Sequence, residues 1–169
     1  PKGCGKAAGM GMMLKALGLG PADSWAFGDS YNDVDMLAAA GVDPRAPGLD
    51  IRTYIDDMPD CLAAADLVIS RSGAMTLSEL EASGTASVLI PSPNVAENHQ
   101  YHNAMVLAEH DAAVVIEEKD LTPERLSGRV EELCRDPQTL RRLGRNAQAM
   151  AIIDANERIY SEIMALYKA

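Results

Sequence analysis

The sequence is poor in cysteine, in positive charge and in long hydrophobic runs. Its three cysteines, Cys4, Cys61 and Cys134, form no Cys-x-x-Cys pair, so neither a zinc site nor a disulfide framework is indicated. The formal net charge is −10, which disfavours a nucleic-acid partner because unspecific binding to phosphates needs a basic surface. No apolar run approaches the roughly 18 residues of a membrane span. A reducing cytoplasm is the simplest compartment for such a chain.

The sequence itself has the composition of an ordinary globular domain. It contains 169 residues, of which 47% are hydrophobic and 24% charged. A chain of this length buries roughly two-thirds of its surface, which is enough for one core. One domain is therefore the default, with a boundary expected in the segment 41–50, which is rich in Pro and Gly.

Strand-like and helix-like segments alternate along the chain, which predicts an α/β fold with a doubly wound parallel sheet. Ligands of such sheets bind beyond the carboxyl ends of the strands. Helices are expected over 6–18, 32–40, 59–65, 76–83, 98–109, 123–134, 137–149 and 154–167, and strands over 25–27, 51–55, 67–69, 87–90 and 113–116.

The most informative segment is 70–79, Ser-Arg-Ser-Gly-Ala-Met-Thr-Leu-Ser-Glu, which leads from a predicted strand into a predicted helix. Free backbone N–H groups and the helix dipole at such a turn form an anion site. Glu79, one helical turn inside, is placed to accept hydrogen bonds from a ribose diol. The alternative interpretation is a plain capping box over Thr76–Glu79.

A second polar segment, 91–104, follows the predicted strand 87–90. Gln100 and Asn103 are one helical turn apart on the same face, and amides both donate to and accept from sugar hydroxyls. The alternative is an ordinary helix N-terminus capped by Asn98, with solvated amides. His99 and His102 have metal-ligand spacing, but the sequence offers no evident third ligand.

A third segment, 28–37, places Asp29 and Asp33 four residues apart at a predicted strand-to-helix turn. Paired carboxylates there suit a hard cation such as Mg²⁺. An Asp- and Asn-rich turn that caps the helix is the alternative.

Residues 51–167 resemble the C-terminal half of the MurG-type glycosyltransferases, with matches at Tyr54–Met58, Ala65–Glu79 and His99–Ala104 in the same order and spacing. The family transfers N-acetylglucosamine from UDP-GlcNAc to the lipid-linked muramoyl-pentapeptide of peptidoglycan synthesis, at the inner face of the plasma membrane. The resemblance implies the Rossmann-like, donor-binding C-terminal lobe of a two-lobed GT-B enzyme that needs no cofactor. The donor-binding residues that it implies are Ile55, Ala74, Met75, Thr76, Leu77, Ser78, Glu79, Gln100 and Asn103.

Within that set the resemblance also implies individual roles. The backbone of Ile55 would meet the uracil. Thr76 would meet a phosphate, Glu79 the ribose hydroxyls and Gln100 the hydroxyls of N-acetylglucosamine, with Asn103 nearby.

Residues 2–42 resemble the C-terminal part of Cof-type phosphatases of the haloacid dehalogenase superfamily. In that family a lysine like Lys6 steadies the phosphoryl group, and a motif like Gly28–Met36 holds magnesium, here through Asp29 and Asp33. The superfamily's nucleophilic aspartate is absent from this sequence, so phosphatase turnover is not expected. The domains expected are therefore a haloacid-dehalogenase-like fragment over 1–45 and a glycosyltransferase donor lobe over 46–169.

The part of the family that this sequence resembles includes neither the acceptor lobe nor the catalytic base. We therefore assign no catalytic residue, and the expectation of a hexosyltransferase rests on the family alone. Weak or no binding of UDP-GlcNAc is expected of the isolated chain. The last predicted helix is expected to expose Ile159, Ile163 and Leu166, a face for self-association. Residues 1–42 are expected to substitute for missing parts of the lobe, with Trp25–Phe27 joining the sheet edge. An inactive donor lobe, a Mg²⁺-dependent phosphatase remnant and a non-catalytic interaction module are the three functions considered.

Overall fold

A computed structural model describes residues 54–168 of the chain. The predicted elements over 6–18, 25–27 and 32–40, and the pair Asp29 and Asp33, lie outside the described residues. The elements are α3 (Met58–Ala64), β1 (Val68–Ser70), α4 (Ala74–Ser83), β2 (Ser87–Leu89), η2 (Ala96–Asn98), α5 (His99–Glu109), β3 (Val114–Val115), η3 (Glu118–Asp120), α6 (Pro123–Cys134), α7 (Pro137–Met150) and α8 (Ala155–Lys168).

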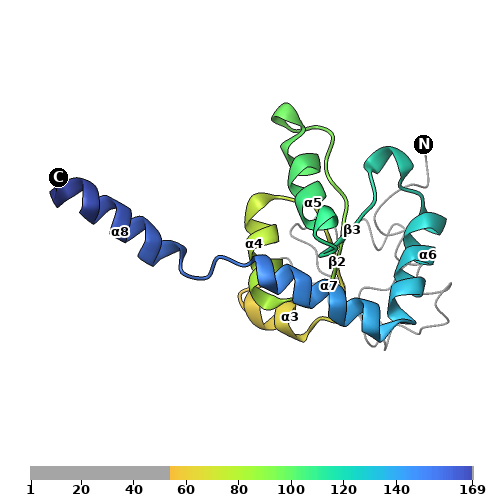
Figure 1. The fold of residues 1–169 in the computed structure, drawn as a ribbon. Helices are drawn as coiled ribbons and strands as arrows, with labels where there is room; N and C mark the ends of the chain where they lie inside the picture. The colour runs from red at the N-terminus through yellow and green to blue at the C-terminus, as the bar shows by residue number, and fades with distance from the viewer. Residues whose placement is uncertain (1–53, 169) are drawn as a thin grey trace.

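The described strands form one parallel sheet in the order β1-β2-β3, with helices on both faces (Figure 1). In the register, Ile69 pairs with Val88 and Leu89 pairs with Val115. The parallel α/β fold predicted from the alternating pattern is confirmed. Every helix and strand predicted between 59 and 167 is present, with ends within two residues of the prediction. Tyr54 and Ile55, predicted to end a strand, lie in no strand.

The start of α4 corrects one expectation. The helix begins at Ala74, its N-cap is Gly73 in an extended conformation, and no side chain caps it. Thr76 is therefore the third residue of the helix, and the capping box over Thr76–Glu79 is wrong. The physical reason is that β1 ends at Ser70 and the backbone turns into the helix directly after Gly73, before the local Thr-x-x-Glu signal is reached.

Alternate strand residues pack on opposite faces of the sheet, as expected for strands covered on both sides. The neighbours Val88 and Leu89 are both 0% exposed and belong to different clusters. The cluster beneath α3, α4, α5 and the second half of α7 contains Leu62, Leu77, Leu80, Leu89, Ala104, Leu107, Ala112, Ala113 and Ala147. The cluster beneath α6 and α7 contains Ala86, Val88, Ile116, Leu133 and Leu143.

Two glycines let α4 and α7 approach each other closely. Gly84 ends α4 in the left-handed conformation, φ 68°, and its N–H donates to the carbonyls of Leu80 and Glu81. Gly144 of α7 faces the same turn, where a Cβ on Gly144 would overlap the carbonyl oxygen of Gly84. The contact fixes α7 across the carboxyl end of α4.

The starts of α6 and α7 follow from local sequence. Pro123 and Pro137 occupy the first turn of each helix, where a missing N–H costs nothing. The side chains of Thr122 and Asp136 cap the two helices by accepting from backbone N–H groups of the first turn. These signals explain why the predicted starts are confirmed.

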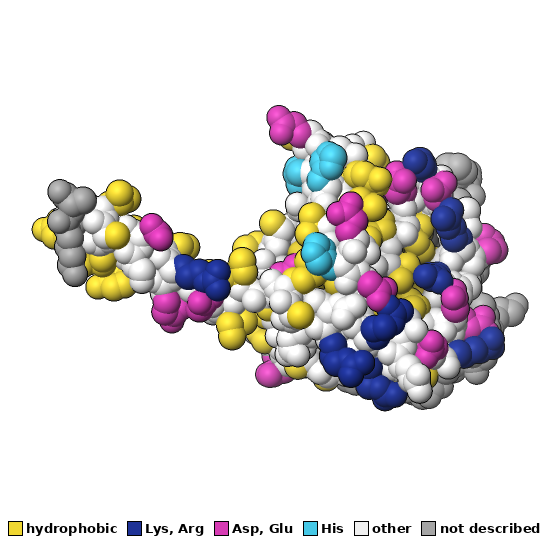
Figure 2. Space-filling model, in the orientation of Figure 1, with side chains coloured by type: hydrophobic (Ala, Val, Ile, Leu, Met, Phe, Trp, Pro, Cys, Tyr) yellow, Lys and Arg dark blue, Asp and Glu magenta, His cyan; other side chains and the backbone are white. Residues whose placement is uncertain are grey.

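The helix α8 projects away from the rest of the described part (Figures 1 and 2). Ile159, Ile163 and Leu166 are 58%, 57% and 79% exposed, which confirms the predicted apolar face. Figure 2 shows hydrophobic side chains along this projecting helix. Within residues 54–168, no helix combines the length and the apolarity that crossing a bilayer requires.

Candidate functional site

The candidate site lies where the parallel strands end. β1 leads through the turn Arg71–Gly73 into α4, β2 leads through a loop and η2 into α5, and β3 leads into η3. Since all described strands are parallel, these three exits meet at one edge of the sheet. The segments 70–79 and 91–104, singled out from sequence, are therefore brought to the same edge.

The first turn of α4 offers backbone donors. No side chain caps the helix, so the first-turn N–H groups, which have no partner inside a helix, face outward. Ala74, Met75, Ser78 and Glu79 are exposed and Thr76 is half-buried. An anion at this terminus would meet both the N–H groups and the positive end of the helix dipole.

Leu77 and Ile55 differ from the exposed residues of this segment because their side chains are buried. The Leu77 side chain is 6% exposed within the hydrophobic core, and its N–H donates to the Gly73 carbonyl at 3.0 Å. Ile55 precedes α3 and is 9% exposed. A ligand contact of either residue would therefore come through the backbone, and Leu77 has already used its donor.

Ser72 joins the turn after β1 to the start of α5. Its side chain is 0% exposed, and its hydroxyl donates to the backbone carbonyl of Gln100 at 2.7 Å. The Asn103 side chain returns a hydrogen bond, donating through Nδ2 to the Ser72 carbonyl at 3.3 Å. The predicted pair Gln100 and Asn103 thus lies directly beside the turn that opens α4.

The side chain of Gln100 reaches the loop after β2. Its Oε1 accepts from the backbone N–H of Ser92 at 2.9 Å. Asn98 is the N-cap of α5, as expected, yet it caps with no side-chain hydrogen bond. The reason is that Glu97 and Asn98 both adopt positive φ, 52°, which turns the chain sharply into the helix.

Arg71 connects the three strand exits. Its guanidinium donates to the carbonyl of Ile90, just after β2, at 3.1 Å. It also forms an ion pair with Glu118 in η3, after β3. The Arg71 side chain therefore links the segments that follow the three strands. Sequence reasoning did not single this arginine out.

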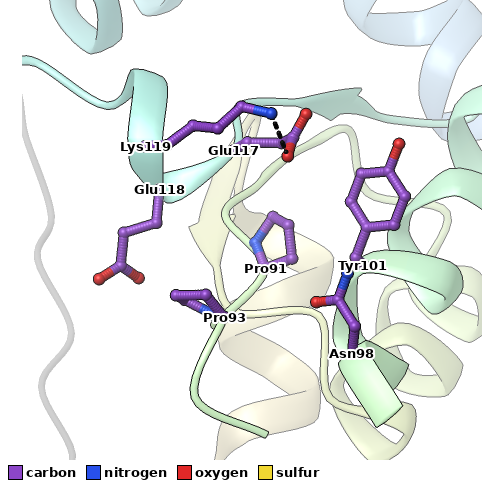
Figure 3. Close-up of a pocket in the computed structure, with 7 residues that line it drawn as sticks. All are labelled: Pro91, Pro93, Asn98, Tyr101, Glu117, Glu118 and Lys119. Atoms are coloured by element: carbon purple, nitrogen blue, oxygen red, sulfur yellow. Dashed lines mark ion pairs between the residues drawn. The ribbon is translucent and has the colours of Figure 1, made fainter.

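A shallow pocket of about 330 Å³ opens at this edge (Figure 3). Figure 3 shows Pro91 at its centre and Tyr101 on one side, with Lys119 bent toward Glu117. The Nζ atom of Lys119 lies 3.0 Å from Oε2 of Glu117. The hydrogen bond and the negative charge of Glu117 raise the pKa of Lys119. The pocket is lined by Pro91, Pro93, Asn98, Tyr101, Glu117, Glu118 and Lys119.

Sequence reasoning missed Ser72 and Ser92 as well as Arg71. Both serines act through contacts with Gln100, 28 and 8 residues away in the chain. The local signal was a small polar residue two or three positions after the end of a strand. Within residues 54–168, no group of three or more His, Cys, Asp and Glu side chains could hold a metal ion.

The sequence matches known families over most of its length. Residues 27–159 match the family described as "Glycosyltransferase family 28 C-terminal domain", and residues 1–43 match "haloacid dehalogenase-like hydrolase". A UDP-N-acetylglucosamine–N-acetylmuramyl-(pentapeptide) pyrophosphoryl-undecaprenol N-acetylglucosamine transferase of Acetivibrio thermocellus is 46% identical over 144 residues, 85% of this chain and 38% of that protein. The enzyme of the same name from Thermoanaerobacter sp. is 50% identical over 113 residues, 67% of this chain and 31% of that protein.

The fold is shared with solved glycosyltransferases. The crystal structure of Acinetobacter baumannii MurG superposes with a TM-score of 0.79 at 27% identity, over 95% of this chain and 46% of that one. The glycosyltransferase VinC, in complex with dTDP, has the same fold at 20% identity, with a TM-score of 0.61, over 82% of this chain and 32% of that one. The chain spans about a third of the length of the curated relatives that it matches. Because the match over residues 27–159 covers most of the sequence, the chain belongs to the glycosyltransferase family 28 C-terminal domain family.

Proposed function

We propose that this chain is the donor-binding lobe of a transferase that moves N-acetylglucosamine from UDP-GlcNAc to the lipid-linked muramoyl-pentapeptide. The observation that carries the proposal is the junction of two elements at one sheet edge. The uncapped start of α4 and the amide-bearing start of α5 are hydrogen-bonded through Ser72. A nucleotide sugar has an anionic diphosphate and a hydroxyl-rich sugar, which are the groups that these two elements suit.

Within this proposal each predicted residue has one task, except Leu77, whose side chain is buried in the core and whose N–H is already bonded to Gly73. The first-turn N–H groups of Ala74 and Met75, with the hydroxyls of Thr76 and Ser78, face the diphosphate. Glu79 accepts hydrogen bonds from the ribose hydroxyls. The side-chain amides of Gln100 and Asn103 form hydrogen bonds with the hydroxyls of N-acetylglucosamine. The Ile55 backbone meets the uracil.

The acceptor site and the catalytic base are assigned to a partner lobe, because the relatives carrying the printed activity are about three times as long as this match. The glycosyltransferase part is assigned no metal. The relatives' names specify an acceptor linked to undecaprenol, a membrane lipid, and this supports a location of the present chain at the cytoplasmic face of the membrane.

An NMR titration of the whole chain with UDP-GlcNAc tests the proposal, because it detects the weak binding expected of one lobe. Amide shifts are expected in 73–79 and 100–103. Glu79→Ala is expected to weaken binding about tenfold, the size of a lost hydrogen bond to a charged group. Glu109→Ala, an exposed glutamate at the opposite end of α5, is the matched control and is expected to leave affinity unchanged. Absence of shifts at millimolar ligand, or equal effects of the two variants, would refute the proposal.

The match of residues 1–43 to the haloacid dehalogenase-like hydrolases is the basis of a second candidate activity, a Mg²⁺-dependent phosphatase remnant, although this sequence lacks the superfamily's nucleophilic aspartate. Under it, residues 1–45 form a separate fragment from 46–169, and Asp29 and Asp33 bind Mg²⁺. A colorimetric phosphatase assay with Mg²⁺ on the whole chain, compared with Asp29→Ala, tests this activity. Equal phosphate release by both proteins, or none by either, would eliminate it.

The exposed apolar face of α8 supports self-association of the isolated chain. Light scattering across a concentration series is expected to show a mass that rises with concentration. Ile163→Glu, in the middle of this face, is expected to return the mass to that of a monomer. A concentration-independent monomer of the unchanged chain would contradict this.

A further inference from the structure

We propose that Ser72 is a positioning residue, whose buried hydroxyl sets the sugar-contacting start of α5 against the nucleotide-contacting start of α4. The inference rests on the proposed function and adds to it a residue that itself touches no ligand. With 0% of its side chain exposed, Ser72 can act only through its protein neighbours.

Both hydrogen bonds of Ser72 cross between the two ligand-contacting elements. Its hydroxyl donates to the Gln100 carbonyl at 2.7 Å, and its carbonyl accepts from Asn103 Nδ2 at 3.3 Å. Gln100 and Asn103 occupy the first and second turns of α5, whereas Ser72 lies two residues before α4. Ser72 therefore holds α5 through hydrogen bonds to Gln100 and Asn103, on the face that carries the predicted sugar contacts.

The orientation of the Gln100 side-chain amide depends on these two hydrogen bonds. The backbone N–H of Ser92 donates to Gln100 Oε1 at 2.9 Å, and only the amide oxygen can accept such a bond. Oε1 is thus used by the protein, and the amide NH₂ is the group left to donate to a sugar hydroxyl. If α5 shifts, the bond to Ser92 lengthens and this donor loses its fixed direction.

Loss of the Ser72 hydroxyl leaves the start of α4 in place. The first turn of α4 is held by its own bond from the Leu77 N–H to the Gly73 carbonyl and by the buried Leu77 and Leu80 side chains. The consequence is a split effect: contacts to the nucleoside diphosphate persist, whereas contacts to the sugar weaken. A residue that merely stabilised the fold would weaken both together.

The experiment compares the whole chain with Ser72→Ala and with Ser83→Ala. Ser83 is the matched control, because its half-buried hydroxyl bonds to the Leu80 carbonyl and to the Thr85 hydroxyl, at the end of α4 away from the site. Affinities for UDP and for UDP-GlcNAc are measured by NMR titration, and the exchange rate of the Ser92 amide is measured without ligand.

In Ser72→Ala, we expect the ratio of UDP-GlcNAc affinity to UDP affinity to fall about fivefold, with UDP affinity unchanged. A factor of five corresponds to about 1 kcal/mol, the size of one hydrogen bond. Exchange of the Ser92 amide is expected to accelerate by a similar factor. Ser83→Ala is expected to change neither quantity.

Equal losses for both ligands, or an unchanged Ser92 exchange rate in Ser72→Ala, would overturn the inference. Failure of the unchanged chain to bind either ligand would instead refute the proposed function. The ligand-free exchange measurement would then still decide whether Ser72 holds α5 against α4, so the two failures are distinguishable.

Discussion

The contact between Gly144 and Gly84 makes a sharp test of the packing that supports the site. A Cβ on Gly144 would overlap the Gly84 carbonyl oxygen and lie 3.2 Å from its carbonyl carbon. These are backbone atoms of a turn whose N–H is already bonded to the Leu80 carbonyl at 3.0 Å, so they cannot give way as a flexible side chain would. Gly144→Ala is therefore expected to push α7 away from α4.

The magnitude follows from two opposing terms. Overpacking of a core costs about 1–3 kcal/mol, and overlap with backbone places this case at the upper end. Alanine favours a helix over glycine by about 1 kcal/mol, which offsets part of that cost. The net expectation is a loss of about 2 kcal/mol in the free energy of unfolding.

Gly128 of α6 provides the matched control. It is also a helical glycine, but a Cβ there would have no atom within 4 Å. Gly128→Ala should therefore show the helix propensity alone, a gain of about 1 kcal/mol. Urea unfolding of both variants, followed by circular dichroism, gives the two values. Shifts of the same sign and size in the two variants would refute the packing argument.

Two further predictions concern stability. The hydroxyl of Ser87 is buried without a hydrogen-bond partner among the described residues, so Ser87→Ala should leave the free energy of unfolding unchanged or raise it by about 1 kcal/mol, and a loss in urea unfolding would contradict this. Hydrogen bonds from Thr139 and the first-turn backbone of α7 hold the pKa of Asp136 below its ordinary value of 3.8. Its contribution to stability is thus full above that value and lost as the pH falls through the lower, folded-state pKa. Asp136→Asn should flatten the pH dependence of the melting temperature below pH 4, and an unchanged acid slope would count against this role.

Local signals made much of the described fold predictable. Thr122-Pro123 and Asp136-Pro137 place a capping side chain directly before a proline, which marks a helix start without reference to the rest of the chain. The apolar segments 87–90 and 113–116 likewise identify strands of a sheet covered on both faces. At α4 the local Thr-x-x-Glu signal failed, because β1 ends at Ser70 and the backbone enters the helix at Ala74.

The sequence by itself determined the alternating α/β order, the family and the two polar segments that carry the candidate contacts. Each of these depends on neighbouring residues or on a shared pattern. Only the tertiary structure showed that Ser72 holds Gln100 and Asn103, that Arg71 joins three strand exits, and that Gly144 meets Gly84. These contacts join residues between 19 and 60 positions apart, and their geometry is fixed by how helices pack on the sheet. A local pattern holds no information about that packing.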